Sequence, residues 1–143
     1  MIHDIKQQKK ILRQQLRARR QALSTGIQQQ HAEQVAQQLL SAYHWQAGMR
    51  VAVTQAFDGE VDLQPTTALL QRQGVACFLP IIQMDKTLLF SPYLIGESLS
   101  LNYLGINEPS YQTISLSIDQ LDVILMPLVG FDSQGNRLGM GGG

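Results

Sequence analysis

The sequence lacks the features of a membrane-spanning or disulfide-rich secreted protein. Its single cysteine, Cys77, cannot form an internal disulfide, and it lies in the apolar run 75–79. No apolar run approaches the ~20 residues that a transmembrane helix needs, and the polar, basic N-terminus lacks the apolar segment of a secretory signal. The sequence therefore predicts a cytoplasmic protein in which Cys77 is a small core residue.

The sequence also has few groups that suit a zinc site. Its three histidines, His3, His31 and His44, show no ligand spacing with one another or with Cys77. A structural or catalytic zinc needs three or four such ligands brought together, usually from closely spaced pairs. We therefore expect no metal site built from histidine or cysteine.

Charged residues are scarce and unevenly distributed. They make up 15% of the 143 residues, and the 11 Lys and Arg residues balance the 11 Asp and Glu residues. Seven of the 11 bases lie in residues 1–20, beside the single acid Asp4, so this segment carries a charge of about +6 and the remainder about −6. The overall balance argues against a dedicated nucleic-acid binder, but the basic N-terminal segment needs its own explanation.

Helical and strand patterns alternate along a chain of single-domain length. Apolar residues spaced by 7, 4 and 7 predict a helix over 3–23, and a second apolar stripe predicts a helix over 27–43. A third helix is expected over 65–72, because Pro65 suits its first turn and Gly74 suits its end. Strands are expected over 51–57, 75–82, 88–94 and 123–129, and residues 95–118 are expected to be irregular.

These elements predict a three-layer α/β sandwich, Rossmann-like, with a mostly parallel sheet and helices on both faces. The β-α-β unit over 50–82 requires two parallel strands. The run 123–129 is apolar throughout, so we expect a strand buried on both faces. Ligands of such sheets bind outside the carboxyl ends of the strands, where the loops 58–62 and 132–143 would face one pocket.

The glycine loop, residues 135–143, is the most informative segment for function. Arg137 lies among its glycines, which occupy positions 135, 139, 141, 142 and 143. Glycine lets backbone amides turn inward and lets a bulky anion approach, and a guanidinium beside such a loop is typical of a phosphate site. The loop matches neither the Walker pattern nor G-x-G-x-x-G. Phosphate binding is nevertheless favoured over a merely flexible tail.

Four short segments, in order along the chain, carry a more specific resemblance. They are Lys-Lys-Ile-Leu-Arg at 9–13, Phe-Asp-Gly-Glu-Val-Asp at 57–62, Gly-Ile-Asn-Glu-Pro at 105–109, and the segment 127–143 with Asn-Arg-Leu-Gly-Met-Gly-Gly-Gly. Together they resemble the 5-formyltetrahydrofolate cyclo-ligase family, also called methenyltetrahydrofolate synthetase, over the whole chain. Two positions depart from the family pattern: Leu63 replaces the usual Thr, and Gln55 stands at a pocket-wall position that is usually apolar.

The resemblance implies an enzyme that closes 5-formyltetrahydrofolate into 5,10-methenyltetrahydrofolate. It implies that ATP and Mg²⁺ are used, that the formyl oxygen is phosphorylated, and that ADP and phosphate are released. Catalytic roles are implied for Lys9 and Arg137. The implied ATP-binding residues are Lys9, Lys10, Ile11, Leu12, Arg13, Arg137, Leu138, Gly139, Met140, Gly141, Gly142 and Gly143. The implied folate-binding residues are Gln55, Glu60, Met140, Gly141, Gly142 and Gly143, with Glu60 holding the pterin through hydrogen bonds.

The resemblance also bears on the metal and on the extent of the chain. In the family a Tyr-Tyr-Asp-Arg run follows the glycine loop and supplies the magnesium-binding aspartate. We therefore expect no metal ligand within this chain, which would be C-terminally truncated and inactive as given. The expected partner is the folate substrate alone, with no nucleic acid or membrane, and the full-length protein is expected to be a monomer.

Two other functions stay open at this point. The basic N-terminal helix alone would suit a binding module for RNA or an anionic membrane. A relative of the same fold that binds a sugar phosphate or a CoA ester would also need an anion loop. Single residues have simpler interpretations as well: Lys9 and Arg13 as a solvated basic face, and Asp58, Glu60 and Asp62 as turn or cap residues.

Overall fold

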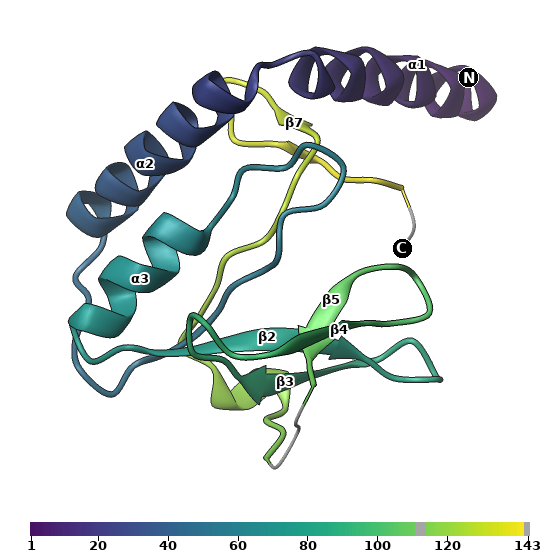
Figure 1. The fold of residues 1–143 in the computed structure, drawn as a ribbon. Helices are drawn as coiled ribbons and strands as arrows, with labels where there is room; N and C mark the ends of the chain where they lie inside the picture. The colour runs from purple at the N-terminus through teal and green to yellow at the C-terminus, as the bar shows by residue number, and fades with distance from the viewer. Residues whose placement is uncertain (111–113, 142–143) are drawn as a thin grey trace.

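The structure is a computed structural model, and it describes residues 1–110 and 114–141 (Figure 1). Two long helices open the chain, α1 (Ile2–Gln21) and α2 (Thr25–Ala42). They meet at Ser24, whose hydroxyl accepts a hydrogen bond from the Ile27 N–H and so caps α2. Figure 1 shows α2 lying along the body of the molecule, whereas α1 runs away from α2 toward the upper right.

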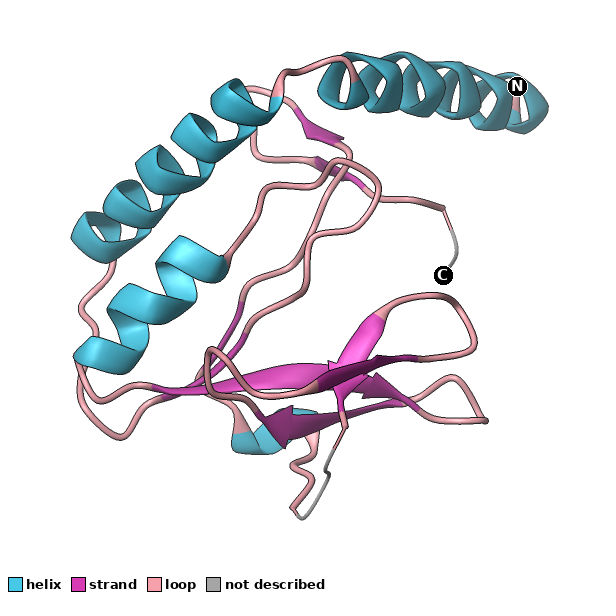
Figure 2. Ribbon diagram, in the orientation of Figure 1, coloured by secondary structure: helices cyan, strands magenta, loops and turns pink. Residues whose placement is uncertain are grey.

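A four-stranded sheet forms the centre of the molecule (Figure 2). Its strands are β1 (Arg50–Ala52), β2 (Ala76–Ile82), β3 (Leu88–Pro92) and β6 (Val123–Ile124), in the order β3-β2-β1-β6. Strand β1 is parallel to both β2 and β6, and only β3 runs antiparallel to its neighbour. Helix α3 (Gln64–Arg72) connects β1 to β2. The mixed α/β class with a mainly parallel sheet is therefore confirmed.

Successive side chains along a strand point to opposite faces of the sheet, so the core is divided between these two faces. On the first face, strand residues pack beneath α3, and α2 in turn contacts α3. The cluster there comprises Val51, Val53, Leu70, Val75, Cys77, Leu79 and Tyr93. On the second face, Ala52, Phe78 and Phe90 pack against Leu116, close to the short 3₁₀ turn η1 (Ile118–Gln120). Cys77 is a buried free cysteine, as the sequence predicts.

Two small antiparallel pairs complete the described chain. Strands β4 (Leu99–Leu101) and β5 (Asn107–Pro109) pair within the segment that was expected to be irregular, so that expectation is wrong in part. Strands β7 (Gly130–Phe131) and β8 (Arg137–Leu138) form a hairpin that brings the glycine loop back toward α1. No helix in the described part is both long and apolar enough to cross a bilayer.

The last strand of the sheet is shorter and more exposed than expected. The apolar run 123–129 predicted a strand buried on both faces, but β6 ends at Ile124. Met126 is 58% exposed and Leu128 is 37% exposed. The cause is that β6 pairs with β1 alone and that Pro127 has no N–H to extend the pairing. Strand β1 likewise ends at Ala52, and the chain that follows leaves the sheet toward α1 (Figure 1).

Candidate active site

Helix α1 meets the rest of the protein along one stripe of side chains. Arg13, Arg17 and Arg20 are spaced by four and three residues, so they lie on the same side of the helix. Leu16 lies on that side as well, and a Cβ built on Gly130 would stand only 2.5 Å from its Cδ1 atom. The missing side chain at Gly130 therefore lets α1 lie directly against the backbone of β7.

Asp58 receives most of the polar contacts of this stripe. Its Oδ2 atom lies 2.6 Å from Arg17 Nε and 2.9 Å from Arg20 Nη2, and its carbonyl accepts a 2.7 Å hydrogen bond from Arg20 Nε. The Gln21 amide donates to the other carboxylate oxygen. The Arg17 hydrogen bond, with further contributions from Arg20 and Gln21, holds the pKa of Asp58 well below its usual range. We call Asp58, Arg17, Arg20 and Gln21 the Asp58 cluster.

The glycine loop meets two guanidinium groups. Arg13 Nε donates a 2.7 Å hydrogen bond to the Gly139 carbonyl. A Cβ on Gly141 would lie 3.0 Å from Arg13 Cζ, and a Cβ on Gly139 would lie 3.1 Å from Arg137 Nη2. Glycine at these two positions therefore leaves the space that the arginines occupy. Gly141 also has a φ of +87°, which other residues rarely adopt.

These groups border a cavity of about 470 Å³, which we call the arginine pocket. Its lining comprises Arg13, Glu60, Pro127, Leu128, Arg137, Gly139, Met140 and Gly141. Two guanidinium groups and one carboxylate give the pocket a net positive charge. The loops that follow β1 and β8 thus meet in one cavity that suits an anion with several negative oxygens.

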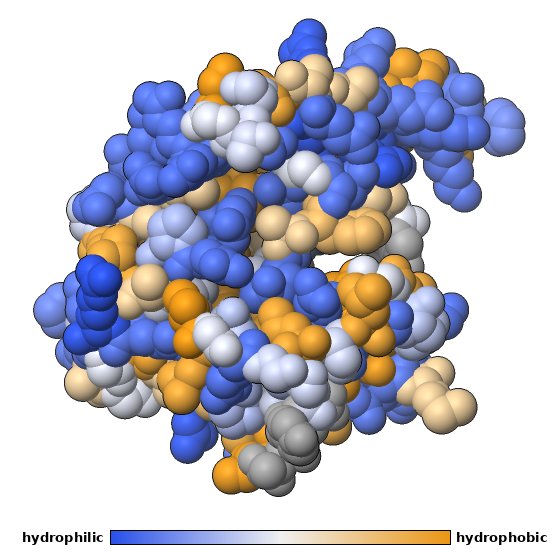
Figure 3. Space-filling model, in the orientation of Figure 1, coloured by the Kyte–Doolittle hydropathy of each residue, from blue (hydrophilic) through white to orange (hydrophobic). Residues whose placement is uncertain are grey.

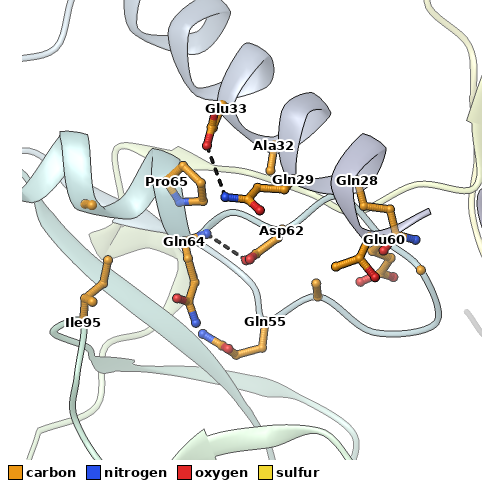
Figure 4. Close-up of a pocket in the computed structure, with 14 residues that line it drawn as sticks. Gln28, Gln29, Ala32, Glu33, Gln55, Glu60, Asp62, Gln64, Pro65 and Ile95 are labelled. Carbon is orange, nitrogen blue, oxygen red and sulfur yellow. Dashed lines mark hydrogen bonds between the residues drawn. The ribbon is translucent and has the colours of Figure 1, made fainter. Parts of the chain in front are cut away.

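A larger cavity of about 760 Å³, the glutamine pocket, opens between α2, the loop after β1 and the start of α3 (Figure 4). Its lining includes the amides of Gln28, Gln29, Gln55 and Gln64 and the carboxylates of Glu33, Glu60 and Asp62, and it contains no Lys or Arg. Figure 4 shows the amides of Gln55 and Gln64 pointing toward one another. Such a lining suits a neutral ligand that is rich in N–H donors.

Glu60 is the residue that the cavities share. It lines the arginine pocket, the glutamine pocket and a third, apolar pocket of about 300 Å³ beside Val35 and Leu125. Its Oε2 atom accepts a 3.2 Å hydrogen bond from the Phe57 N–H. Burial raises the pKa of Glu60, because the neighbouring groups do not fully replace the water lost around the charge.

The structure brings only some of the expected site residues together. Arg13, Arg137 and the described glycine-loop residues 139–141 meet Glu60 in the arginine pocket, and Gln55 lines the adjoining glutamine pocket. Residues 9–12 are exposed on α1 and border none of these cavities, and Leu138 pairs with Gly130 in the β7–β8 hairpin. Gly142 and Gly143 lie outside the described residues. Across residues 1–110 and 114–141, no cluster of His, Cys, Asp or Glu is arranged to hold a metal ion.

Sequence reasoning missed the Asp58 cluster. Asp58 was interpreted as a turn residue, and its φ of 54° does place it in a turn. The residues that bind it lie 37 to 41 positions earlier in the chain, so no local pattern connects them. The one available signal was the spacing of Arg13, Arg17 and Arg20 along one helix face.

Comparisons with known proteins identify the family of this chain. Residues 5–143 match the sequence profile of the 5-formyltetrahydrofolate cyclo-ligase family. The chain belongs to this family. The 5-formyltetrahydrofolate cyclo-ligase of Escherichia coli strain K12 is 39% identical over 131 residues, which cover 90% of this chain and 72% of that protein. The resemblance found in the sequence is therefore confirmed.

Solved structures of cyclo-ligase family proteins share the fold. The 5,10-methenyltetrahydrofolate synthetase of Aquifex aeolicus is similar with a TM-score of 0.75 and 25% identity, covering 94% of this chain and 68% of that one. The synthetase of Mycoplasma pneumoniae gives a TM-score of 0.70 at 23% identity, covering 93% and 71%. The mainly parallel α/β fold is thus common to this chain and these two cyclo-ligase relatives.

Proposed function

We propose that the protein is an ATP-dependent 5-formyltetrahydrofolate cyclo-ligase that forms 5,10-methenyltetrahydrofolate, ADP and phosphate. One observation carries the proposal: the arginine pocket and the glutamine pocket adjoin, and Glu60 borders both. A reaction between a nucleotide and a folate needs two neighbouring sites. One must bind the phosphate anion, and the other must accept hydrogen bonds from the N–H groups of the folate. The name of the family supports a folate as one ligand, and ATP is the ligand that we propose for the anion site.

The arginine pocket is the proposed site for the ATP phosphates. Arg13 and Arg137 bring two permanent positive charges to a loop whose glycines allow close approach of the backbone. In the transfer of a phosphoryl group, charge spreads over its equatorial oxygens, and fixed guanidinium groups stabilise that charge without reorganising. Arg137 fits this role better than Lys9, because Lys9 lies outside the pocket.

The glutamine pocket is the proposed site for the pterin end of the folate. A pterin presents an amino group and ring N–H groups, and a carboxylate such as Glu60 can accept two of these hydrogen bonds at once. Gln55 and Gln64 supply both donors and acceptors on the same wall (Figure 4). The glutamate of the folate carries negative charge. We therefore place it outside the glutamine pocket, whose lining has no Lys or Arg to bind it.

The chemistry needs activation of the formyl oxygen, which is a poor leaving group. We propose that it accepts the γ-phosphoryl group of ATP as the bond to ADP breaks and ADP leaves. N10 then attacks the formyl carbon and loses its proton, and phosphate leaves with the former formyl oxygen. The protein's own part is to hold the two ligands in line and to stabilise charge through Arg13 and Arg137. The described residues offer no cluster that fits Mg²⁺, so no step of this proposal is assigned to a metal.

The proposal extends to the setting of the enzyme. We propose a single α/β domain acting as a monomer on small-molecule substrates in the cytoplasm, which accords with one buried free cysteine. The rival RNA-binding function is disfavoured because three arginines of the basic helix are engaged by the protein's own backbone and by Asp58. A site for a sugar phosphate or a CoA ester is disfavoured because the adjoining glutamine pocket has carboxylates but no Lys or Arg in its lining.

Calorimetric titration of ATP into the protein and into Arg137→Ala tests the nucleotide site. Losing one hydrogen-bonding charge should weaken ATP binding by about 1.5–3 kcal/mol. The matched control is Arg72→Ala, because Arg72 is an exposed arginine at the end of α3 and lines none of these cavities. Competition with ribose 5-phosphate and with CoA addresses the alternative ligands. Equal ATP affinity of Arg137→Ala and the control would remove Arg137 from the site, and no ATP binding to the unmodified protein would overturn the proposal.

A further inference from the structure

We infer that Asp58 is a positioning residue: it fixes α1 beside the glycine loop and thereby holds Arg13 where the ATP phosphates bind. The inference rests on the proposed nucleotide site. It adds a role for a residue that touches neither ligand pocket, since Asp58 borders neither the arginine pocket nor the glutamine pocket. In this role Asp58 acts through the arginines of α1.

The first support is the number of contacts that converge on one residue. Arg17, Arg20 and Gln21 all donate to the Asp58 carboxylate, and Arg20 donates in addition to the Asp58 carbonyl. Arg20 also reaches the Leu128 carbonyl at 3.2 Å, and Leu128 lines the arginine pocket. The Asp58 cluster therefore joins α1 to the loop after β1 and to the segment after β6, and both of these border the arginine pocket.

The second support is that, within the described part, α1 depends on its arginines rather than on apolar burial for its attachment. None of its residues is buried, and Ile5 and Leu12 are about half exposed. Figure 3 shows mostly hydrophilic residues over this helix at the upper right. The close approach of Leu16 to Gly130 limits how near α1 can come, but apolar contact has no direction and does not by itself fix the rotation of the helix about its axis. Directional hydrogen bonds from Arg17 and Arg20 remove that freedom.

The third support is the geometry of the loop. Asp58 and Gly59 have φ values of 54° and 74°, both in the left-handed region. This turn directs Asp58 to α1, while Glu60, two residues later, borders the cavities. Arg13 lies one helical turn before Arg17, so a rotation of α1 would pull Arg13 away from the Gly139 carbonyl. Loss of the Asp58 cluster would thus act on the nucleotide site through Arg13 and have a smaller effect on the glutamine pocket.

The test is Asp58→Asn, because asparagine tolerates the left-handed backbone and has nearly the same shape while lacking the charge. The control is Asp85→Asn, in the exposed turn between β2 and β3, where Asp85 binds only Thr87. Trypsin cleavage within α1 is followed without ligand, since cleavage reports how often the helix detaches. ATP affinity, folate affinity and the thermal midpoint are measured on the same proteins.

We expect Asp58→Asn to speed cleavage of α1 and to weaken ATP binding, each by roughly tenfold, as for the loss of charge-assisted hydrogen bonds. Folate affinity should change much less than ATP affinity relative to Asp85→Asn. In Arg20→Ala the same two quantities should change, and the double variant should add little to either single change, because both remove one cluster.

Two results would overturn the inference. One is cleavage and ATP affinity equal to the control, which would show that Asp58 does not hold the helix. The other is a lowered thermal midpoint with equal weakening of both ligands, which would make Asp58 a general structural residue. Absence of ATP binding to the unmodified protein would instead defeat the proposed function and the ATP half of this inference. The ligand-free cleavage rates would still decide whether Asp58 holds α1.

Discussion

The two helices on either side of Ser24 are attached to the protein by different forces. Helix α2 buries Ala32 and Ala36 and packs on α3, whereas α1 buries no residue and is held by arginine hydrogen bonds. Apolar burial is strong but has no direction, and charge-assisted hydrogen bonds contribute less but fix an angle. The body of the molecule therefore sets stability, and the region around α1 sets the geometry of the site.

The largest effect that separates these regions should come from the body. Leu70 on α3 is completely buried, so Leu70→Ala should lower the free energy of unfolding by about 2–5 kcal/mol. The ligand affinities of the molecules that remain folded should stay unchanged. Urea denaturation measures the loss, with the fully exposed Met84→Ala as the control. A loss as small as that of the control would mean that α3 is not part of the stabilising core.

A smaller effect, confined to ligand binding, is expected at Glu60. Glu60→Gln keeps the shape but removes the charge, so it should weaken folate binding by about 1.5–3 kcal/mol and change ATP binding little. Calorimetric titration of the folate measures this loss. An unchanged folate affinity would leave Glu60 as a turn residue only.

The raised pKa of Glu60 adds a pH dependence with a definite sign. Because burial favours the protonated form, this group stabilises the fold below its ordinary pKa, and that contribution is lost as the pH rises through the raised value. Glu60→Gln should therefore be no less stable than the unmodified protein at neutral pH. Folate affinity of the unmodified protein should fall on acidification at a higher pH than for an ordinary Glu, and the variant should lack this fall.

The smallest effect is expected in the glycine loop. Gly141→Ala and Gly135→Ala both place a side chain at positive φ, +87° and +81°, and each should cost about 1 kcal/mol of stability. The two sites differ in one respect: a Cβ at 141 meets the Arg13 guanidinium, whereas a Cβ at 135 meets nothing within 4 Å. Only Gly141→Ala should weaken ATP binding. Equal ATP affinities of the two variants would show that Arg13 need not lie against the loop.

The main elements of the fold were predictable because local rules determine them. Helix α3 begins near Pro65 and ends before Gly74, and α2 begins after its Ser24 cap. Strands β4 and β5 escaped prediction because a strand of only three residues carries no clear periodicity. The run 123–129 was misleading because its composition suits a central strand, while its position at the sheet edge and Pro127 end it at Ile124.

The site was predictable to a similar extent. Motif resemblance named Arg13, Arg137 and Glu60, which the structure brings to one pocket. It also named Lys9, which lies outside that pocket, because a helix motif does not say which turn faces the cavity. The role of Asp58 could not be predicted, since an acidic turn residue looks the same in sequence whether it faces solvent or three donors from a distant helix.

If ATP and the folate bind in the two pockets as proposed, the position of Glu60 at their common border would link the two binding equilibria. A ligand that displaces water from one side of the Glu60 carboxylate shifts the protonation of Glu60. That shift then alters how well Glu60 binds a ligand on its other side. If bound nucleotide changes the affinity for folate by some factor, bound folate must change the affinity for nucleotide by the same factor. A linkage that passes through this carboxylate would also depend on pH, because protonation of Glu60 would change both affinities together.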